Sequence, residues 1–398
     1  MRDAITAHVI HCTLKRSRPL NGGSDVVQKR FRFGRTLQQC MDQPADNFLL
    51  LRFLAALIVV FCHAYDTAGF SEADPIARLH LAGGATPPLT GGSIAVDMFF
   101  AISGFMIAGS YMRRRRLADF LLARVLRILP AYALCVVSCA FVLGAVVTTL
   151  PLRDYLLDPG TRAYALGNLD FTHMVWRLPG VFDDNPHPRG VNDSLWSLPG
   201  EVRMYAYVAL FGAIGLLNRR WLANLALLGL FALGCLAPAR IPLIYDVTLY
   251  LRLAALFAFG VACYVNRDYV PVSGWILLAL GARCALLYGT QMFMPAFGLV
   301  TGYFCLCFAY GTRWYGFNRL GDYSYGMYLW NWPVQQMIAH YMRTDQPLLM
   351  FALSLPLVLL LAVASWHCLE KPALTLKRIE LARVLARWRA AKAAPATR

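Results

Sequence analysis

Two ionisable residues, Arg52 and His63, stand within one apolar run of the sequence that extends from Leu49 to Ala64. Eleven residues of α-helix return to nearly the same face and rise ~16 Å, so both side chains are predicted to share a helix face. Ionisable groups in an apolar segment of membrane length are costly, and by default they mark a functional site. The simpler alternatives are a snorkelling anchor for Arg52 and a packed or interfacial histidine at position 63.

The next apolar run contains Asp97, Ser103 and Gly104. An aspartate at membrane depth needs a partner, and Arg52 or His63 would serve if the two helices pack together. Ser103 and Gly104 are small enough to let two helices approach closely. Packing alone is the simpler explanation of these two small residues.

Arg124 and Arg127, three residues apart, are predicted to lie on one face of a further helix. Paired guanidinium groups in that arrangement can clamp phosphates bidentately. Simple anchoring at the cytoplasmic end of a span explains the same spacing equally well.

Two more segments are unusually polar or aromatic. In SLWSLPGE at 194–201, Glu201 follows a proline and suits the first turn of a helix, where it would be either a capping carboxylate or part of a site lining. In GDYSYGMYLWNWP at 321–333, the aromatic residues suit an interfacial belt, but the run is too long and too polar for a belt alone. Pro333 is predicted to open the helix beside Asn331.

The composition predicts an all-α, polytopic transmembrane helical bundle. Hydrophobic residues make up 58% of the 398 residues and charged residues only 15%, which is too apolar for a soluble domain of this length. About ten stretches approach the ~20 residues that cross a bilayer. The predicted spans are 48–64, 92–111, 127–149, 200–217, 222–238, 244–264, 272–289, 294–311, 322–341 and 347–367.

The net charge of +16 follows this topology. With ten spans and both termini cytoplasmic, the basic clusters fall inside and most acidic residues between spans fall outside, as the positive-inside rule requires. Topology and contact with anionic lipid therefore explain the charge better than nucleic-acid binding does. The basic clusters are Arg113–Arg116, Arg124 with Arg127, Arg219 with Arg220, Arg267, Arg313 with Arg319, and the tail after Lys371.

The two ends of the chain differ from its middle. Residues 1–45 are basic and polar without a signal peptide, and we expect a disordered extension that is either a cytoplasmic tail or, if translation starts at Met41, not made. Residues 46–372 would form the ten-span membrane domain. Residues 373–398 would form a basic cytoplasmic tail, with a helix lying on the membrane surface. Eleven cysteines without a C-x-x-C pair predict packing residues, with no disulfide framework and no metal site.

Taken in order, these elements resemble the acyltransferase-3 family of integral membrane O-acyltransferases, which modify bacterial surface and secreted glycans. The likeness runs from about residue 46 to 372. Its motifs are Arg52 and His63 within LRFLAALIVVFCHA, VDMFFAISGF at 96–105, Arg124 with Arg127, SLWSLPGE at 194–201, GDYSYGMYLW at 321–330, and Glu370-Lys371-Pro372. Any one motif is weak, but six in order make the resemblance specific.

The resemblance implies acyl transfer from acyl-CoA, usually acetyl-CoA, to a sugar hydroxyl. The acyl-CoA would be a co-substrate on the cytoplasmic side, with no permanently bound cofactor. The acceptor would be a glycan or lipid-linked sugar, and the location the bacterial inner membrane. Arg52, Arg124 and Arg127 would bind the CoA phosphates.

His63 would accept the proton of the attacking hydroxyl or form an acyl-histidine. Asp97 would orient or balance His63, or pair with Arg52, and Glu201 would line the acceptor side. We expect substrate contacts from the further residues Ser103, Trp196, Tyr325 and Asn331.

One position departs from the family pattern. Where relatives often carry a histidine, this chain has Asn331, which can donate and accept hydrogen bonds but cannot shuttle a proton at neutral pH. We expect it to position substrate in place of that histidine. Because only 26 residues follow Pro372, we expect no fused extracytoplasmic domain of the kind that some relatives carry. Transfer would then be either completed within the membrane domain or passed to a separate extracytoplasmic partner.

Two other classes of function remain open. A transporter or flippase of a lipid-linked sugar or small anion would use Arg52, Asp97 and His63 as a relay. A non-catalytic scaffold in a polysaccharide assembly complex would not need His63 at all.

Overall fold

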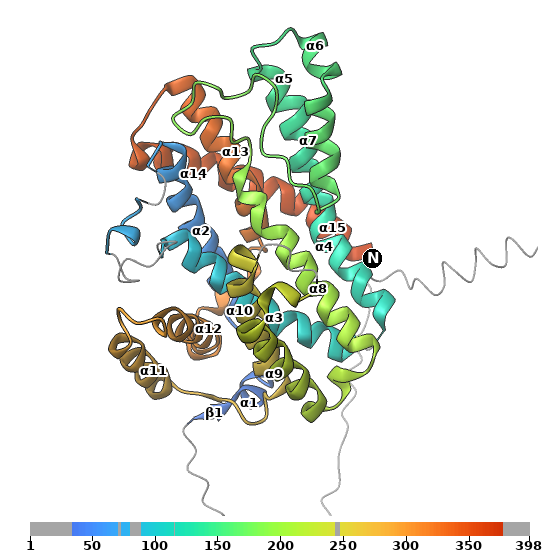
Figure 1. Cartoon of the computed structure of the whole chain (residues 1–398), viewed down its shortest axis with the longest axis vertical. Helices are drawn as coiled ribbons and strands as arrows, with labels where there is room; N and C mark the ends of the chain where they lie inside the picture. The colour runs from blue at the N-terminus through green and yellow to red at the C-terminus, as the bar shows by residue number, and fades with distance from the viewer. Residues whose placement is uncertain (1–33, 71–72, 80–88, 115, 243–246, 377–398) are drawn as a thin grey trace, which may run out of the picture. The chain divides into compact units, whose positions relative to one another are not determined.

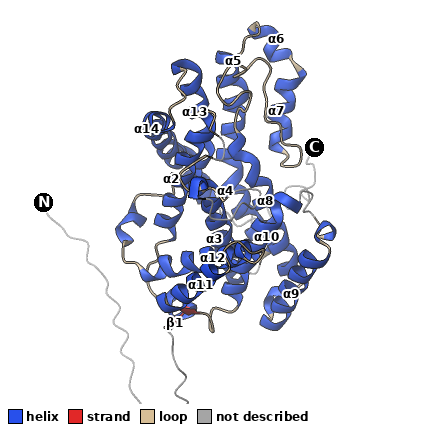
Figure 2. Cartoon of the chain, turned by 60° about the vertical axis from the view of Figure 1, so that its left-hand side comes forward, coloured by secondary structure: helices blue, strands red, loops and turns tan. Residues whose placement is uncertain are grey.

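The computed structural model describes residues 34–70, 73–79, 89–114, 116–242 and 247–376, and their regular structure is almost entirely helical (Figure 1, Figure 2). The all-α prediction is confirmed. Ten apolar helices among these residues overlap the ten predicted spans. They are α2 (Phe48–Thr67), α3 (Gly91–Arg114), α4 (Leu117–Ser138), α8 (Leu198–Ala213), α9 (Arg220–Leu236), α10 (Val247–Val265), α11 (Gly274–Leu286), α12 (Phe293–Gly311), α13 (Ser324–Met342) and α14 (Pro347–Ser365).

Five of the helical stretches in the described residues are long and apolar enough to cross a membrane. Three further helices are apolar but shorter, namely α9, α11 and the Tyr250–Val265 part of α10. That the chain crosses ten times, with both ends inside, stays a prediction. The five long stretches are α2, α3, Leu117–Val147, α12 and Pro347–Thr375.

Two of the long stretches contain π-helical turns. One turn, Cys139–Leu143, joins α4 to α5 (Gly144–Val147), and the other, Trp366–Glu370, joins α14 to α15 (Lys371–Thr375). The segment after α5 carries α6 (Leu152–Leu157), α7 (Pro159–Leu169) and the 3₁₀ turn η3 (Asp193–Ser197). Figures 1 and 2 show α5, α6 and α7 together at one end of the helical unit, with α9 at the opposite end.

The prediction of disorder up to residue 45 is wrong for its last part. Strand β1 (Arg35–Thr36) pairs antiparallel with β2 (Pro271–Val272), and α1 (Leu37–Met41) follows at once. Thr36 caps α1, because its hydroxyl accepts from the Gln39 backbone N–H, and Leu37 and Cys40 are buried against the helices. Residues 1–33 lie outside the described residues, as does most of the predicted C-terminal tail, 377–398.

The centre of the fold is α3, which contacts α2, α4, α8, α10 and α12. Its crossing with α10 is the tightest of these contacts. A Cβ on Gly104 would overlap the Phe257 carbonyl group, and a Cβ on Gly260 would overlap the Ala101 carbonyl. Gly104 therefore serves the close helix packing that the sequence predicts, with α10 as its partner.

Replacing Gly104 tests this crossing. Gly104→Val should lower the free energy of unfolding by about 1–3 kcal/mol, because the added methyl groups must push the α10 backbone away. Chemical unfolding in detergent micelles measures the change. Gly229→Val in α9 is the matched control, since a Cβ there meets nothing within 4 Å. Equal losses in the two variants would show that the crossing tolerates separation.

Candidate functional site

The predicted site residues separate into two main groups along α2. Near the start of α2, Arg52 belongs to a charge cluster, which we define as Arg52, Arg127, Asp322 and Glu370. Toward the other end of α2, His63 belongs to a histidine cluster, defined as His63, Asn331 and Ser194. The shared face of Arg52 and His63 thus leads from ion pairs to hydrogen bonds with two neutral side chains.

The charge cluster joins four segments of the chain. Asp322, just before α13, lies 2.6 Å from Arg52 of α2 and 2.5 Å from Arg127 of α4. Arg127 also bonds Glu370, the last residue of the π-helical turn after α14, at 2.9 Å. The Glu370 side chain is 1% exposed, while those of Asp322 and Arg127 are 14% exposed. Two cations thus meet two anions, so the cluster is close to neutral as it stands.

Ring contacts support the same arginine. The Arg127 guanidinium lies 5.5 Å from the Tyr325 ring and 5.8 Å from the Trp366 ring. Tyr325 is buried, and its hydroxyl donates to the Ile128 carbonyl of α4 at 3.1 Å. Tyr325, which was predicted to contact substrate, therefore packs against Arg127 of the charge cluster.

Asp97 has a different partner from those expected. Its Oδ1 lies 3.3 Å from Nε of Arg252 on α10, whereas Arg52 pairs with Asp322 and His63 with Asn331. The predicted pairing of Asp97 with Arg52 or His63 is therefore wrong. The physical reason is the tight crossing of α3 with α10, which brings a cation from α10 to this buried carboxylate.

Asn331 is the close partner of His63 in the histidine cluster. Asn331 Oδ1 lies 2.6 Å from His63 Nδ1, and Ser194 Oγ lies 3.3 Å from the same nitrogen. The His63 ring packs edge-on against Trp332, with ring centroids 4.9 Å apart. His63 is partly exposed, whereas Asn331 is fully buried.

The bonds of Asn331 fix which nitrogen of His63 carries the proton. Asn331 Nδ2 donates to the Met327 carbonyl at 3.1 Å and to the Tyr328 carbonyl at 2.6 Å, so its oxygen must face the imidazole. A carboxamide oxygen only accepts, and His63 Nδ1 therefore bears the hydrogen. In the neutral imidazole, Nε2 then carries the lone pair, which is the state that a general base needs. Asn331 therefore contacts His63 through its oxygen and backbone carbonyls through its nitrogen, and its contact with substrate stays a prediction.

A strap, residues 182–193, covers this end of α13. Gln336 donates to the carbonyls of His187 and Gly190 at 2.9 Å and 2.6 Å, and Trp332 Nε1 donates to the Gly190 carbonyl at 3.1 Å. His187 pairs with Asp193 at 3.0 Å. The His187 ring also packs edge-on against Trp332, the ring that contacts His63, with centroids 5.1 Å apart.

A third polar group lies between α3, α4 and α8. Ser103 donates to Glu201 at 3.0 Å, and the Tyr205 hydroxyl also bonds Glu201. The Arg124 guanidinium lies 5.9 Å from the Tyr205 ring, and its buried Nε has no hydrogen-bond partner among the described residues. The structure thus brings together Ser103, Glu201 and Arg124, which were singled out separately in the sequence.

Trp196 belongs to neither cluster, and its contact with substrate stays a prediction. Its backbone carbonyl accepts from the Tyr250 hydroxyl at 2.9 Å, and its side chain is partly buried against the apolar core.

Among the described residues, no group of three or more histidine, cysteine or carboxylate side chains could hold a metal ion.

Sequence reasoning missed the partners rather than the arginines. Asp322 and Glu370 stand in two of the quoted motifs, yet nothing in one sequence pairs them with Arg127. The argument used for Asp97 also applies to Asp322 and Glu370. Each is a carboxylate next to an apolar span, and such a carboxylate needs a cation as its partner. The hydrogen bonds between Gln336 and the strap left no such signal, because most of them involve backbone carbonyls and nothing local pairs Gln336 with Asn185, which is far away in the sequence.

Comparison with known proteins finds sequence similarity over most of the chain. The model of the acyltransferase-3 family, described as an acyltransferase domain, matches residues 46–367. The chain is 27% identical over 346 residues to an O-acetyl transferase of Shigella phage Sf6, with 83% of this chain and 96% of that protein covered. It is 28% identical over 376 residues to nodulation protein 10 of Rhizobium leguminosarum bv. viciae, with 85% and 96% covered. No solved structure gives a significant match.

The shared carboxylate of the charge cluster can be tested directly. Asp322→Asn should lower the free energy of unfolding by about 3 kcal/mol, because it leaves Arg52 without its acidic partner in a partly buried place. Unfolding in mixed detergent micelles measures the loss. Asp183→Asn is the control, because its pair with Arg189 is exposed and should be worth at most about 1 kcal/mol. If the control loses as much as Asp322→Asn, the cluster does not hold the helices together.

Proposed function

We propose that this chain, which belongs to the acyltransferase-3 family and is an acyltransferase, moves an acyl group, most simply acetyl, from acyl-CoA to a hydroxyl of a cell-surface or secreted carbohydrate. O-acyl transfer itself follows from the family and from the similarity to an O-acetyl transferase. The donor and the acceptor are our proposal. A carbohydrate acceptor gains support from a Bacillus subtilis relative, 24% identical over 344 residues, whose provisional name is peptidoglycan O-acetyltransferase.

The observation that carries the proposal is the hydrogen bond between His63 and Asn331. It leaves Nε2 of a neutral imidazole available on a partly exposed side chain. In the proposed reaction, the acceptor hydroxyl gives its proton to Nε2 as its oxygen attacks the thioester carbonyl. The C–S bond then breaks, the acyl ester is formed, and the imidazolium returns the proton to the departing CoA thiolate. An acyl-histidine would be an alternative route through the same nitrogen.

The direction of the reaction follows from the two ends of α2. We propose that the arginine end faces the cytoplasm, where acyl-CoA is made, and that the His63 end faces outward, in a bacterial inner membrane with ten spans. Arg52 and Arg127 already bond carboxylates, so they would have to exchange them for phosphate oxygens. Arg124 has no acidic partner among the described residues and is the first candidate for a CoA phosphate.

Loss of His63 should abolish the chemistry without loss of the fold. We expect His63→Ala to lower acceptor-dependent release of CoA from acetyl-CoA at least 10²-fold, the usual contribution of a general base. Purified protein in lipid nanodiscs and a thiol reagent supply the assay. In cells, proton NMR of the surface polysaccharide should show O-acetyl signals with wild type only.

His173→Ala is the matched control, because His173 lies on the exposed segment after α7 with a side chain that is 84% exposed. It should retain wild-type activity. Full activity of His63→Ala would remove His63 from the mechanism, and a phenotype without any CoA release would favour a transporter.

Asn331 variants should change the pH profile of the reaction. Asn331→Leu cannot hold the Nδ1–H, so the turnover number should fall at least tenfold while the KM for donor stays unchanged. Asn331→Asp should keep activity, but its negative charge favours the imidazolium, so the acidic limb of the rate profile should move to higher pH.

The control is Gln335→Leu, one turn away on α13, which loses a buried amide that bonds Val60 and Ser354. It should cost stability and leave the pH profile in place. Identical profiles for Asn331→Asp and wild type would rule out the contact with His63 as a catalytic one.

A further inference from the structure

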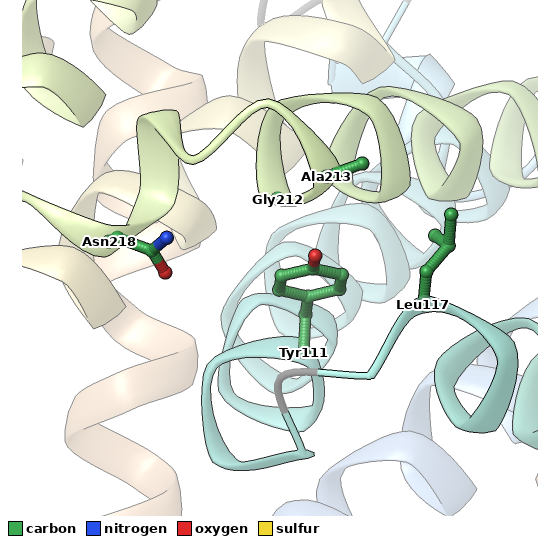
Figure 3. A pocket seen from close by; sticks show the side chains of 5 residues that line it. All are labelled: Tyr111, Leu117, Gly212, Ala213 and Asn218. Carbon is green, nitrogen blue, oxygen red and sulfur yellow. The ribbon is translucent and has the colours of Figure 1, made fainter.

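A cavity of about 580 Å³ opens between α3, α4 and α8, at the end of these helices away from His63. Figure 3 shows its lining, in which the Tyr111 hydroxyl and the Asn218 carboxamide point into the same space. Gly212 makes room for the phenol ring, because a Cβ there would overlap Tyr111. None of the lining residues belongs to the charge cluster or to the histidine cluster. They are Tyr111, Leu117, Gly212, Ala213 and Asn218.

The chemistry of this lining suits a flat heteroaromatic ring. Leu117 and Ala213 offer apolar surface for the face of such a ring. The carboxamide of Asn218 can both donate to and accept from a ring edge, as asparagine does with adenine. The Tyr111 hydroxyl adds one further donor and acceptor.

Two residues of the cavity lining have an arginine as their neighbour in the sequence. Arg116 directly precedes Leu117, and Arg219 directly follows Asn218. Both are exposed, and no acidic side chain pairs with either of them within the described part of the chain. Asp119, two residues beyond Leu117, is an acidic residue close by in the sequence. Two arginines against one aspartate leave a net positive charge next to the lining, which favours an anionic ligand.

Helix geometry connects the cavity with Arg124. Leu117 and Arg124 are seven residues apart on α4, and Gly212 and Tyr205 are seven apart on α8. Seven residues return to nearly the same helix face about 10 Å away. Arg124 and Tyr205, which are in contact at 5.9 Å, therefore lie two turns deeper on the faces that line the cavity.

The same face of α8 continues from Tyr205 toward His63. Glu201, Ser197 and Ser194 follow at spacings of four, four and three residues, along α8 and η3. Each bonds a different helix, since Glu201 accepts from Ser103, Ser197 bonds Tyr328 at 2.7 Å, and Ser194 contacts His63. From the cavity, the order is therefore the lining with Tyr111 and Asn218, then the cation Arg124, and last His63.

We infer that this cavity holds the nucleotide end of the acyl-CoA donor, with its base beside Tyr111 and Asn218 and its phosphates between the rim arginines and Arg124. The sequence of groups along CoA is base, phosphates and thioester, and it matches the sequence of surroundings from the cavity to His63. The inference rests on the proposed function, because it assigns one end of the same donor.

Filling the cavity separates nucleotide binding from catalysis. Ala213→Trp should raise the KM for acetyl-CoA at least tenfold and leave the rate with S-acetylpantetheine, which lacks the nucleotide, unchanged. The matched control is Ile214→Trp, because Ile214 is the next residue, is 62% exposed and does not line the cavity. The control should keep the wild-type preference for acetyl-CoA over S-acetylpantetheine.

The rim arginines give a second, independent measurement. Arg116→Gln and Arg219→Gln should each reduce the same preference several-fold, and the loss should shrink at high salt because the interaction is electrostatic. Arg153→Gln, on α6 at the other end of the fold, should have no effect.

The outcomes distinguish the two proposals. Equal loss of both donors in Ala213→Trp, or a wild type that does not prefer acetyl-CoA, overturns the nucleotide site while His63-dependent transfer stands. A requirement for anionic lipid that disappears in Ala213→Trp, with donor preference intact, would assign the cavity to a lipid headgroup and overturn our inference. Absence of His63-dependent consumption of either donor would instead refute the proposed function and this inference with it.

Discussion

The carboxylate of Asp322 is the contact on which the arrangement of the site depends. It bonds guanidinium groups from α2 and α4 at the point where α13 begins. In a region of low dielectric, none of these charges can part from its partner without a large desolvation cost, so three helices are fixed in rotation and in height. Since Arg52 and His63 belong to one helix, the clamp on Arg52 also sets where His63 lies.

At the end of α2 that carries His63, hydrogen bonds with neutral side chains take the place of the ion pairs made by Arg52. The groups that bond the His63 side chain are an amide and a hydroxyl, both neutral. A carboxylate in the place of Asn331 would favour the imidazolium, whereas a carboxamide orients the ring without adding a charge. Charge therefore holds the helices at one end, and hydrogen bonds with neutral side chains orient the imidazole at the other. The two tasks are separated by about 16 Å of helix.

The sequence predicted what periodicity and composition control. The ten apolar helices, the shared face of Arg52 and His63, and the tight packing at Gly104 follow from spacing and residue type. Partners across the fold do not follow from them, because a carboxylate such as Asp97 can pair with any cation that tertiary packing brings near. The crossing of α3 with α10 selected Arg252, and no local pattern encodes which helix crosses which. Asn331 was found as a departure from a family pattern, but its bond to His63 required the structure.

The strap over α13 has a consequence for how this enzyme class can vary. Its attachment to Gln336 and Trp332 uses the carbonyls of His187 and Gly190, which every amino acid possesses. Buried side chains add to it, since Asn185 bonds Gln336, Asn192 bonds the Leu329 carbonyl, and Phe182 and Val191 pack into the core. The positions left free to vary are the exposed ones, namely Asp183, Asp184, Pro186, Pro188 and Arg189. A segment attached in this way can change its exposed surface near His63 while the buried anchors and the helices stay where they are.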